Sequence, residues 1–256
     1  MSEYPHFALE FPVRMHMTDQ NGFCHAADIM RFMQETAIMQ LEQWGPNYAA
    51  MQSRHQAFVL SRITIDFSIP VRYFETLSSN TWACATSHGV SFDRDFLIFN
   101  EKKETVVSAA SQWALIDTQN ARLLHVEDCG IDYVCGDTVA TSLPLRFRIP
   151  KDANLVTVGE KIVRYSDIDN NGHMNNTHYC SLYCDFLPIA EQGAEQRVAA
   201  LSIAFQREAV QGETILVTRT ETPDENGVYY FRTYRSSDHA VNTEAAVRLT
   251  PMESRN

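Results

Sequence analysis

The sequence predicts an α+β protein built from two copies of one unit, each a helix packed on an antiparallel sheet. Three observations predict this architecture: a polar motif that occurs twice, an apolar helical stripe after each copy, and alternating apolar and polar runs after each stripe. The chain has 256 residues, 45% of them hydrophobic, which suits one large or two small folded domains.

The repeated motif is clearest in the segment RYSDIDNNGHMNNTHY, Arg164 to Tyr179, which crowds acids, carboxamides and an imidazole together. A degenerate copy of this motif lies 150 residues earlier, where Asp19-Gln20-Asn21-Gly22 matches Asp169-Asn170-Asn171-Gly172. Phe23 takes the place of His173 in the copy. Asp, Asn and Gly tolerate positive φ and cap locally, so the shared part suits a turn. The imidazole, a side chain able to transfer protons, belongs to the second copy alone.

An amphipathic helix is expected after each motif. The apolar stripes are Ile29, Met33, Ala37, Leu41 and Trp44 in the first half and Tyr179, Tyr183, Phe186 and Ala190 in the second. The first helix should run from about Ala26 to Trp44, before the stop signal Gly45-Pro46. The second should start near Asn175 or Asn176, both good N-cap residues, and Pro188 should end or kink it.

The remainder of each half has the period of β-strands. Residues 63–77 match 201–215 at an offset of 138, so the first half should hold a longer loop around Asn47 to Phe58. The alternating positions are Val90, Phe92, Phe96 and Ile98; Val107, Ala109, Ser111, Trp113 and Leu115; Ile215 and Val217; and Val228, Tyr230 and Tyr234. A curled antiparallel sheet wrapped around one helix is the hot-dog arrangement, so the two halves predict a tandem (double) hot-dog fold.

These repeats divide the chain into an N-terminal hot-dog domain, residues 1–128, and a C-terminal hot-dog domain, residues 159–256. The segment 129–158, with Pro144, Pro150 and polar residues, is expected to be a linker. We expect the C-terminal domain to carry the catalytic residues, and the N-terminal domain to be non-catalytic and to form the pocket wall.

Composition excludes several classes of function. No apolar run approaches the roughly 18 residues that a membrane span needs, and the start MSEYPHFALEF lacks the features of a secretory or transit peptide, so we expect a cytoplasmic protein. The net charge of -11 disfavours nucleic acid as a partner. None of the six cysteines forms a CxxC pair, and the twelfth position of the calcium-loop-like run from Asp167 is His178 rather than glutamate. We therefore expect no metal and no cofactor.

At this point a family resemblance is specific. The pattern from Ser166 to Asn176 resembles the signature of the acyl-acyl-carrier-protein thioesterases, Ser-Asp-Leu-Asp-x-Asn-x-His-Val-Asn-Asn, in the bacterial type similar to the plant fatty acyl-ACP thioesterases. The segments QETA (34–37), LSRITIDF (60–67) and WALIDTQNARL (113–123) are similar to the family's first domain. The resemblance runs from about Phe11 to Pro251. It implies hydrolysis of fatty acyl-acyl-carrier-protein, which releases free fatty acid and ends chain elongation, with acyl carrier protein as partner.

Carried over residue by residue, the family's catalytic Asp, Asn and His fall on Asp169, Asn171 and His173. Its downstream glutamate falls on Glu208. Independently of the resemblance, His173 and Glu208 match Phe23 and Pro70 in the first half, and this asymmetry indicates a single active site, in the second half. The family's neighbouring cysteine is Ala209 here, and a cysteine nucleophile is excluded at that position.

The residues suit thioester hydrolysis, because a thiolate leaves readily and needs no strong general acid. Asp169, His173 and Glu208 each remain a possible base, Asn171 is suited to hold a water or the carbonyl, and N–H groups at the start of the second helix are expected to hold the oxyanion. Two alternatives stay open: an acyl-coenzyme A thioesterase and a non-catalytic acyl-binding hot-dog protein. Either a monomer or a homodimer suits a tandem chain.

Overall fold

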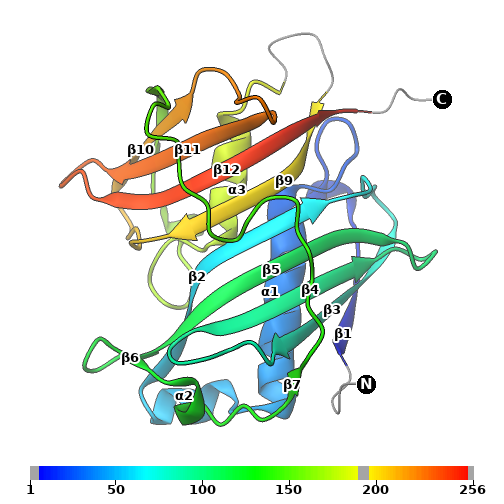
Figure 1. Cartoon of the computed structure of the whole chain (residues 1–256), viewed down its shortest axis with the longest axis vertical. Coiled ribbons are helices and arrows are strands. Elements are labelled where there is room, and N and C mark those ends of the chain that lie inside the picture. Colours follow the sequence, from blue (N-terminus) through cyan, green and yellow to red (C-terminus); the bar gives the residue numbers. More distant parts are fainter. Residues whose placement is uncertain (1–5, 190–195, 253–256) are drawn as a thin grey trace. The chain divides into compact units, whose positions relative to one another are not determined.

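The computed structural model describes residues 6–189 and 196–252, and the chain divides into two compact units, Met1–Thr141 and Ser142–Asn256. Each unit sets a helix against an antiparallel sheet (Figure 1). The segment 129–158, expected to be a linker, holds β7 (Val134–Cys135) and the start of β8 (Leu155–Ile162). The stretch without helix or strand is therefore limited to residues 136–154.

Unit 1 holds a five-stranded antiparallel sheet in the order β1-β3-β4-β5-β2. Its strands are β1 (Phe7–Pro12), β2 (Gln56–Phe67), β3 (Thr76–Cys84), β4 (Phe92–Phe99) and β5 (Thr105–Asp117). The short strand β6 (Arg122–Leu124) pairs with β5, and β7 pairs in parallel with β3. The helices are α1 (Ala26–Trp44), α2 (Tyr48–Ser53) and two 3-10 turns, Met15–Met17 and Val126–Asp128.

The predicted first helix is confirmed at both ends, and its buried face includes Ile29 and Met33. The longer loop of the first half contains α2, because the Asn47 side chain accepts a hydrogen bond of 2.9 Å from the Ala50 N–H and caps this short helix. The strand β1 was not predicted. It precedes the motif and packs on α1 through Phe11, whose ring stacks on Phe32 at 4.6 Å.

Unit 2 repeats the strand order of unit 1, as β8-β10-β11-β12-β9. Its elements are β8, a 3-10 turn (Tyr165–Asp167), α3 (Thr177–Asp185), β9 (Gln196–Phe205), β10 (Thr214–Thr220), β11 (Val228–Arg235) and β12 (Val241–Pro251). The matched positions Phe67 and Phe205 end β2 and β9, and Thr76 and Thr214 start β3 and β10. The internal duplication is therefore a duplication of structure.

The second helix packs its predicted stripe on the sheet. Tyr179 meets Phe205 edge to face at 5.6 Å, and Tyr183 lies 4.9 Å from Phe231. The helix ends before Pro188, and Ala190 lies outside the described residues. The alternation at Val228 and Tyr230 correctly predicts a strand, β11. The residues of β11 that face α3, however, are the intervening ones, such as Phe231. Val228 and Tyr230 instead cluster with Leu143 on the other face. No helix in the described ranges is long and apolar enough to cross a membrane.

Candidate active site

The loop before α3 is fixed by hydrogen bonds that its copy in unit 1 repeats. The Asp169 Oδ1 atom accepts from the Asn171 N–H at 2.8 Å, and the Gly172 N–H donates to the Asp169 carbonyl at 3.0 Å. The same two bonds in unit 1 measure 2.8 and 2.9 Å, and the matched glycines both have positive φ, 80° in the copy and 85° here. The residues that both copies share thus define the shape of the loop.

His173 lies between two carboxylates, one on each side of its ring. Its Nδ1 atom is 3.9 Å from Asp169 Oδ1, and its Nε2 atom is 4.0 Å from Glu208 Oε2. The Asp169 side chain is only 18% exposed, whereas that of Glu208 is 66% exposed. The fold therefore brings together three of the four predicted residues, with a sheltered carboxylate behind the imidazole and a solvated one in front.

A backbone hydrogen bond holds the two segments that carry His173 and Glu208 in register. The Met174 N–H donates to the Ala209 carbonyl at 2.8 Å, and both residues are buried. The segment after β9 is also tied to β12, because the N–H groups of Gln206 and Arg207 donate to the Asn242 carbonyl at 2.9 and 3.0 Å. Met174 follows His173 and Ala209 follows Glu208, so this main-chain bond fixes how far the imidazole lies from the glutamate.

Unit 1 has the matching main-chain hydrogen bond but not the histidine and glutamate. The Cys24 N–H donates to the Val71 carbonyl at 2.8 Å, in the place of the bond between Met174 and Ala209. Phe23 occupies the imidazole position, and the Arg72 guanidinium lies 4.4 Å from the centre of its ring. The asymmetry seen in the sequence is therefore an asymmetry between two loops with matching main-chain hydrogen bonds.

The second helix starts where the sequence predicted, with Asn176 as the N-cap residue of α3. Among the described residues, the Asn176 side chain makes no capping bond, and the Asn175 side-chain oxygen instead accepts from the N–H and the hydroxyl of Thr177, at 2.9 and 2.8 Å. The N–H of His178 donates to the Asn175 carbonyl, and that of Tyr179 to the Asn176 carbonyl. The first N–H groups of the helix are thus occupied, which corrects the expectation that they hold an oxyanion.

Two donors in the loop before α3 are candidates to hold an oxyanion instead: the Asn171 carboxamide and the backbone N–H of His173. The Asn171 side chain is exposed, so its carboxamide is accessible to a ligand. In unit 1 the Phe23 N–H donates to Asp19 Oδ1 at 3.0 Å, but within the described ranges the matching N–H of His173 makes no such bond. The second oxygen of Asp169 instead accepts from the Asn175 amide, at 3.5 Å. Asn175 thus links the sheltered carboxylate to the first turn of α3.

Asp167 has a positional role that the sequence analysis missed. It accepts from the Arg164 N–H at 2.7 Å and lies 2.9 Å from the Lys161 ammonium and 3.5 Å from the His178 ring. Burial alone would raise the pKa of Asp167, but the hydrogen bond from Arg164 and the Lys161 charge outweigh it and hold the pKa below its usual value. The sequence does contain a signal for this role: the copy in unit 1 has Met17 at the matching position, so Asp167 is a further acidic residue that only the second copy has.

The chain holds two helix-backed antiparallel sheets, and one of them carries Asp169 and His173 in the loop before α3 and Glu208 in the segment after β9. This arrangement defines a double hot-dog protein. The family model of the acyl-ACP thioesterase N-terminal domain matches residues 5–133, and that of the acyl-ACP thioesterase C-terminal domain matches residues 152–250. The chain therefore belongs to the acyl-ACP thioesterase family.

Relatives agree with this assignment. A chloroplastic palmitoyl-acyl carrier protein thioesterase of Gossypium hirsutum is 22% identical over 245 residues, 86% of this chain. An acyl-[acyl-carrier-protein] hydrolase of Cuphea viscosissima is 22% identical over 238 residues. This chain spans 56% of the length of each.

Solved structures share the fold. An acyl-ACP thioesterase from Bacteroides thetaiotaomicron superposes with a TM-score of 0.80 at 21% identity, covering 95% of this chain and 97% of that one. The 12:0-ACP thioesterase from Umbellularia californica gives 0.78 at 17% identity, covering 96% and 98%. At these identities the match establishes the double hot-dog fold, which confirms the fold class predicted from the sequence.

Proposed function

We propose that this protein hydrolyses the thioester bond of fatty acyl-acyl-carrier-protein and releases free fatty acid. One observation carries the proposal: in a chain of this family, His173 stands between Asp169 and Glu208 in one unit, and the matching loop of the other unit has Phe23 instead. Hydrolysis of this thioester would end chain elongation in fatty acid biosynthesis.

In this mechanism His173 is the general base. The Nε2 atom and Glu208 Oε2, 4.0 Å apart, are too distant for a direct hydrogen bond but close enough to share one water. That water attacks the thioester carbon while its proton passes to Nε2. The Asp169 carboxylate, 3.9 Å from Nδ1, stabilises by its charge the imidazolium that forms. The carboxylates then have different tasks, positioning water in front and stabilising charge behind.

The oxyanion in this mechanism is held by the exposed Asn171 carboxamide and by the backbone N–H of His173, which, in the part of the chain that the structure describes, lacks the bond to the aspartate that Phe23 makes in unit 1. One donor of this kind typically lowers the barrier by about 3 kcal/mol. Collapse of the tetrahedral intermediate expels the thiolate of the carrier's phosphopantetheine, and the imidazolium returns its proton to that sulfur. Atoms and charge balance without a covalent intermediate, and position 209, an alanine, supplies no nucleophile.

We further propose that the protein acts in the cytoplasm, because all six cysteines are free thiols, as a reducing compartment would keep them.

The test is thiol release from purified acyl-carrier-protein thioesters of several chain lengths, with the matching acyl-coenzyme A thioesters in parallel. A higher kcat/KM on the carrier protein supports the proposal, and a higher value on coenzyme A replaces it with the alternative carrier. Tight acyl-thioester binding without thiol release would identify a non-catalytic binding protein.

A further inference from the structure

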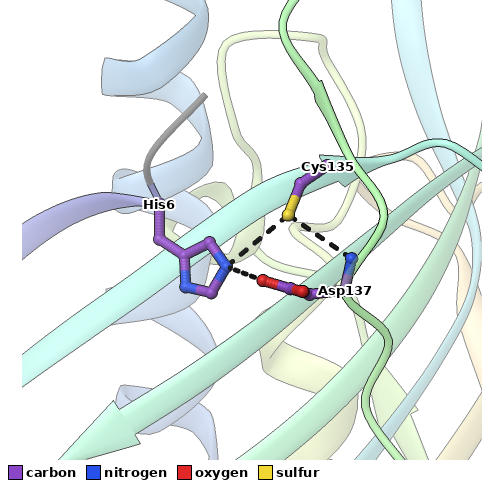
Figure 2. A group of neighbouring side chains, drawn as sticks. All are labelled: His6, Cys135 and Asp137. Atoms are coloured by element: carbon purple, nitrogen blue, oxygen red, sulfur yellow. Dashed lines mark hydrogen bonds and ion pairs between the residues drawn. The ribbon is translucent and has the colours of Figure 1, made fainter. Parts of the chain in front are cut away.

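A second group of chemically active side chains lies in unit 1, outside the candidate active site. His6, just before β1, meets Cys135 at the end of β7 and Asp137 two residues later (Figure 2). The His6 Nε2 atom is 2.9 Å from Asp137 Oδ2 and 3.7 Å from Cys135 Sγ, and the three atoms all lie within 4.8 Å of one another. We propose that these residues form a binding site for a soft or borderline divalent cation, Zn²⁺ in particular.

The geometry argues against a nucleophilic relay of thiol, imidazole and carboxylate. Such a relay needs the thiol at one ring nitrogen and the carboxylate at the other, so that a proton can cross the imidazole. Here both contacts are made by Nε2. Convergence of a nitrogen, a sulfur and an oxygen on one point is the arrangement of metal ligands.

The two separations that involve His6 suit tetrahedral zinc after a small adjustment. Zinc lies about 2.0–2.1 Å from imidazole nitrogen, about 2.3 Å from thiolate sulfur and about 2.0–2.2 Å from carboxylate oxygen, so its ligand atoms stand roughly 3.3–3.6 Å apart. The observed separation of nitrogen and sulfur, 3.7 Å, is close to this value. The separation of nitrogen and oxygen, 2.9 Å, must widen by a few tenths of an ångström, and the exposed Asp137 side chain has room to move.

The surrounding contacts hold the three ligands in place. The Trp82 ring stacks on His6, with centroids 3.8 Å apart and planes inclined by 13°, and the Trp82 indole N–H donates to the Asp137 carbonyl at 2.9 Å. The Asp137 N–H donates to Cys135 Sγ at 3.4 Å, which helps to fix the position of the sulfur. Partners of this kind orient ligands and tune their metal affinity. Trp82 is itself buried, so this support is rigid.

Charge and access are also favourable. A thiolate and a carboxylate balance the two charges of Zn²⁺, and the mix of sulfur and imidazole favours zinc over magnesium or calcium. Cys135 is buried on the protein side while Asp137 is exposed, so an ion can enter from solvent and take a water as fourth ligand. Bound metal would fasten the start of β1 to the segment that follows β7, two distant parts of unit 1.

The experiment is titration of chelator-treated full-length protein with Zn²⁺ alone, followed by thermal unfolding and by binding stoichiometry. A zinc concentration a hundredfold above Kd should raise the Tm by roughly 5–10 °C, with one ion per chain, and Mg²⁺ should not. Co²⁺ in place of Zn²⁺ should give a thiolate charge-transfer absorption band.

Matched variants assign the site. Cys135→Ala and His6→Gln should each abolish the shift and the band, whereas Cys84→Ala should keep both. Cys84 is the proper control because it is buried in the same cluster as Cys135, beside Trp82, but is not part of the convergent group. His6→Gln changes a partly exposed residue near the chain terminus, so it keeps the test decisive if the cysteine variant fails to fold. Zinc binding that is absent in the wild type, or equal in both His6→Gln and the wild type, overturns the proposal.

Discussion

The opposite placement of the two carboxylates beside His173 leads to a quantitative prediction. Asp169→Asn and Glu208→Gln each remove one negative charge near the imidazole while the side chain keeps its size. If His173 is the base, each charge contributes to stabilising the imidazolium in the transition state. The two variants should nevertheless differ widely in their effect on kcat.

The difference follows from exposure, since the two distances, 3.9 and 4.0 Å, are nearly equal. At about 4 Å an ion pair contributes about 4 kcal/mol at the effective dielectric constant near a sheltered site and about 1 kcal/mol in bulk water. Asp169 is sheltered and Glu208 is solvated. Asp169→Asn should therefore lower kcat by up to ~10³-fold, and Glu208→Gln by roughly fivefold.

The assay is thiol release at saturating acyl-carrier-protein thioester, with thermal unfolding to verify each fold. Asp19→Asn is the matched control, because Asp19 accepts the same hydrogen bond in the unit 1 loop but has no histidine beside it. This control should retain the wild-type kcat within about twofold. A loss of 10² or more in Glu208→Gln, with less than tenfold loss in Asp169→Asn, would refute the reasoning and make Glu208 the base.

Three predictions concern stability, measured by thermal unfolding. Asp167→Asn should cost about 2 kcal/mol at pH 7, because it breaks charged hydrogen bonds in a buried setting. The folded-state pKa of Asp167 is lowered, so its contribution is present above the unfolded value of about 4 and is lost as pH falls through the folded value; the gap in Tm to wild type should close with acidification. Gly212→Ala should lower the free energy of unfolding by about 1 kcal/mol from backbone strain alone, since φ is +89° and an added Cβ meets no atom within 4 Å. Phe74 occupies the matching position of unit 1 with φ +72°, so Phe74→Gly should relieve the same strain and raise the Tm by about 1 °C. Gly159→Ala should cost about 1–3 kcal/mol, because its Cβ would come within 2.3 Å of the Phe186 ring; an unchanged Tm would show that the ring is free to move.

Local patterns were sufficient to predict much of the molecule. The periodic stripe gave both ends of α1, because a long amphipathic helix with a Gly-Pro stop has few alternatives. Duplication also aligned Phe67 with Phe205, and in the structure these two residues end matching strands. The proximity of Asp169 to His173 was accessible for the same reason, since the two lie in one short loop.

Contacts between distant segments were not predictable in this way. Asn175 looks like a helix cap in the sequence, and only its side-chain geometry reveals the second bond to Asp169. Strand β1 is short and precedes the motif, so its alternation had too few positions to stand out. His6 and Cys135 are 129 residues apart and match no known ligand spacing, and pairing of β7 with β3 is what brings them together.

The bond from the Met174 N–H to the Ala209 carbonyl, with its counterpart from Cys24 to Val71, joins main-chain atoms only, so it does not depend on which side chains the loop presents. The two units can therefore keep the same loop bond while they differ at His173 and Phe23 and at Glu208 and Pro70. The loop of unit 1 is thus a scaffold for engineering, where Phe23→His and Pro70→Glu would place a second imidazole and carboxylate on the matching backbone positions.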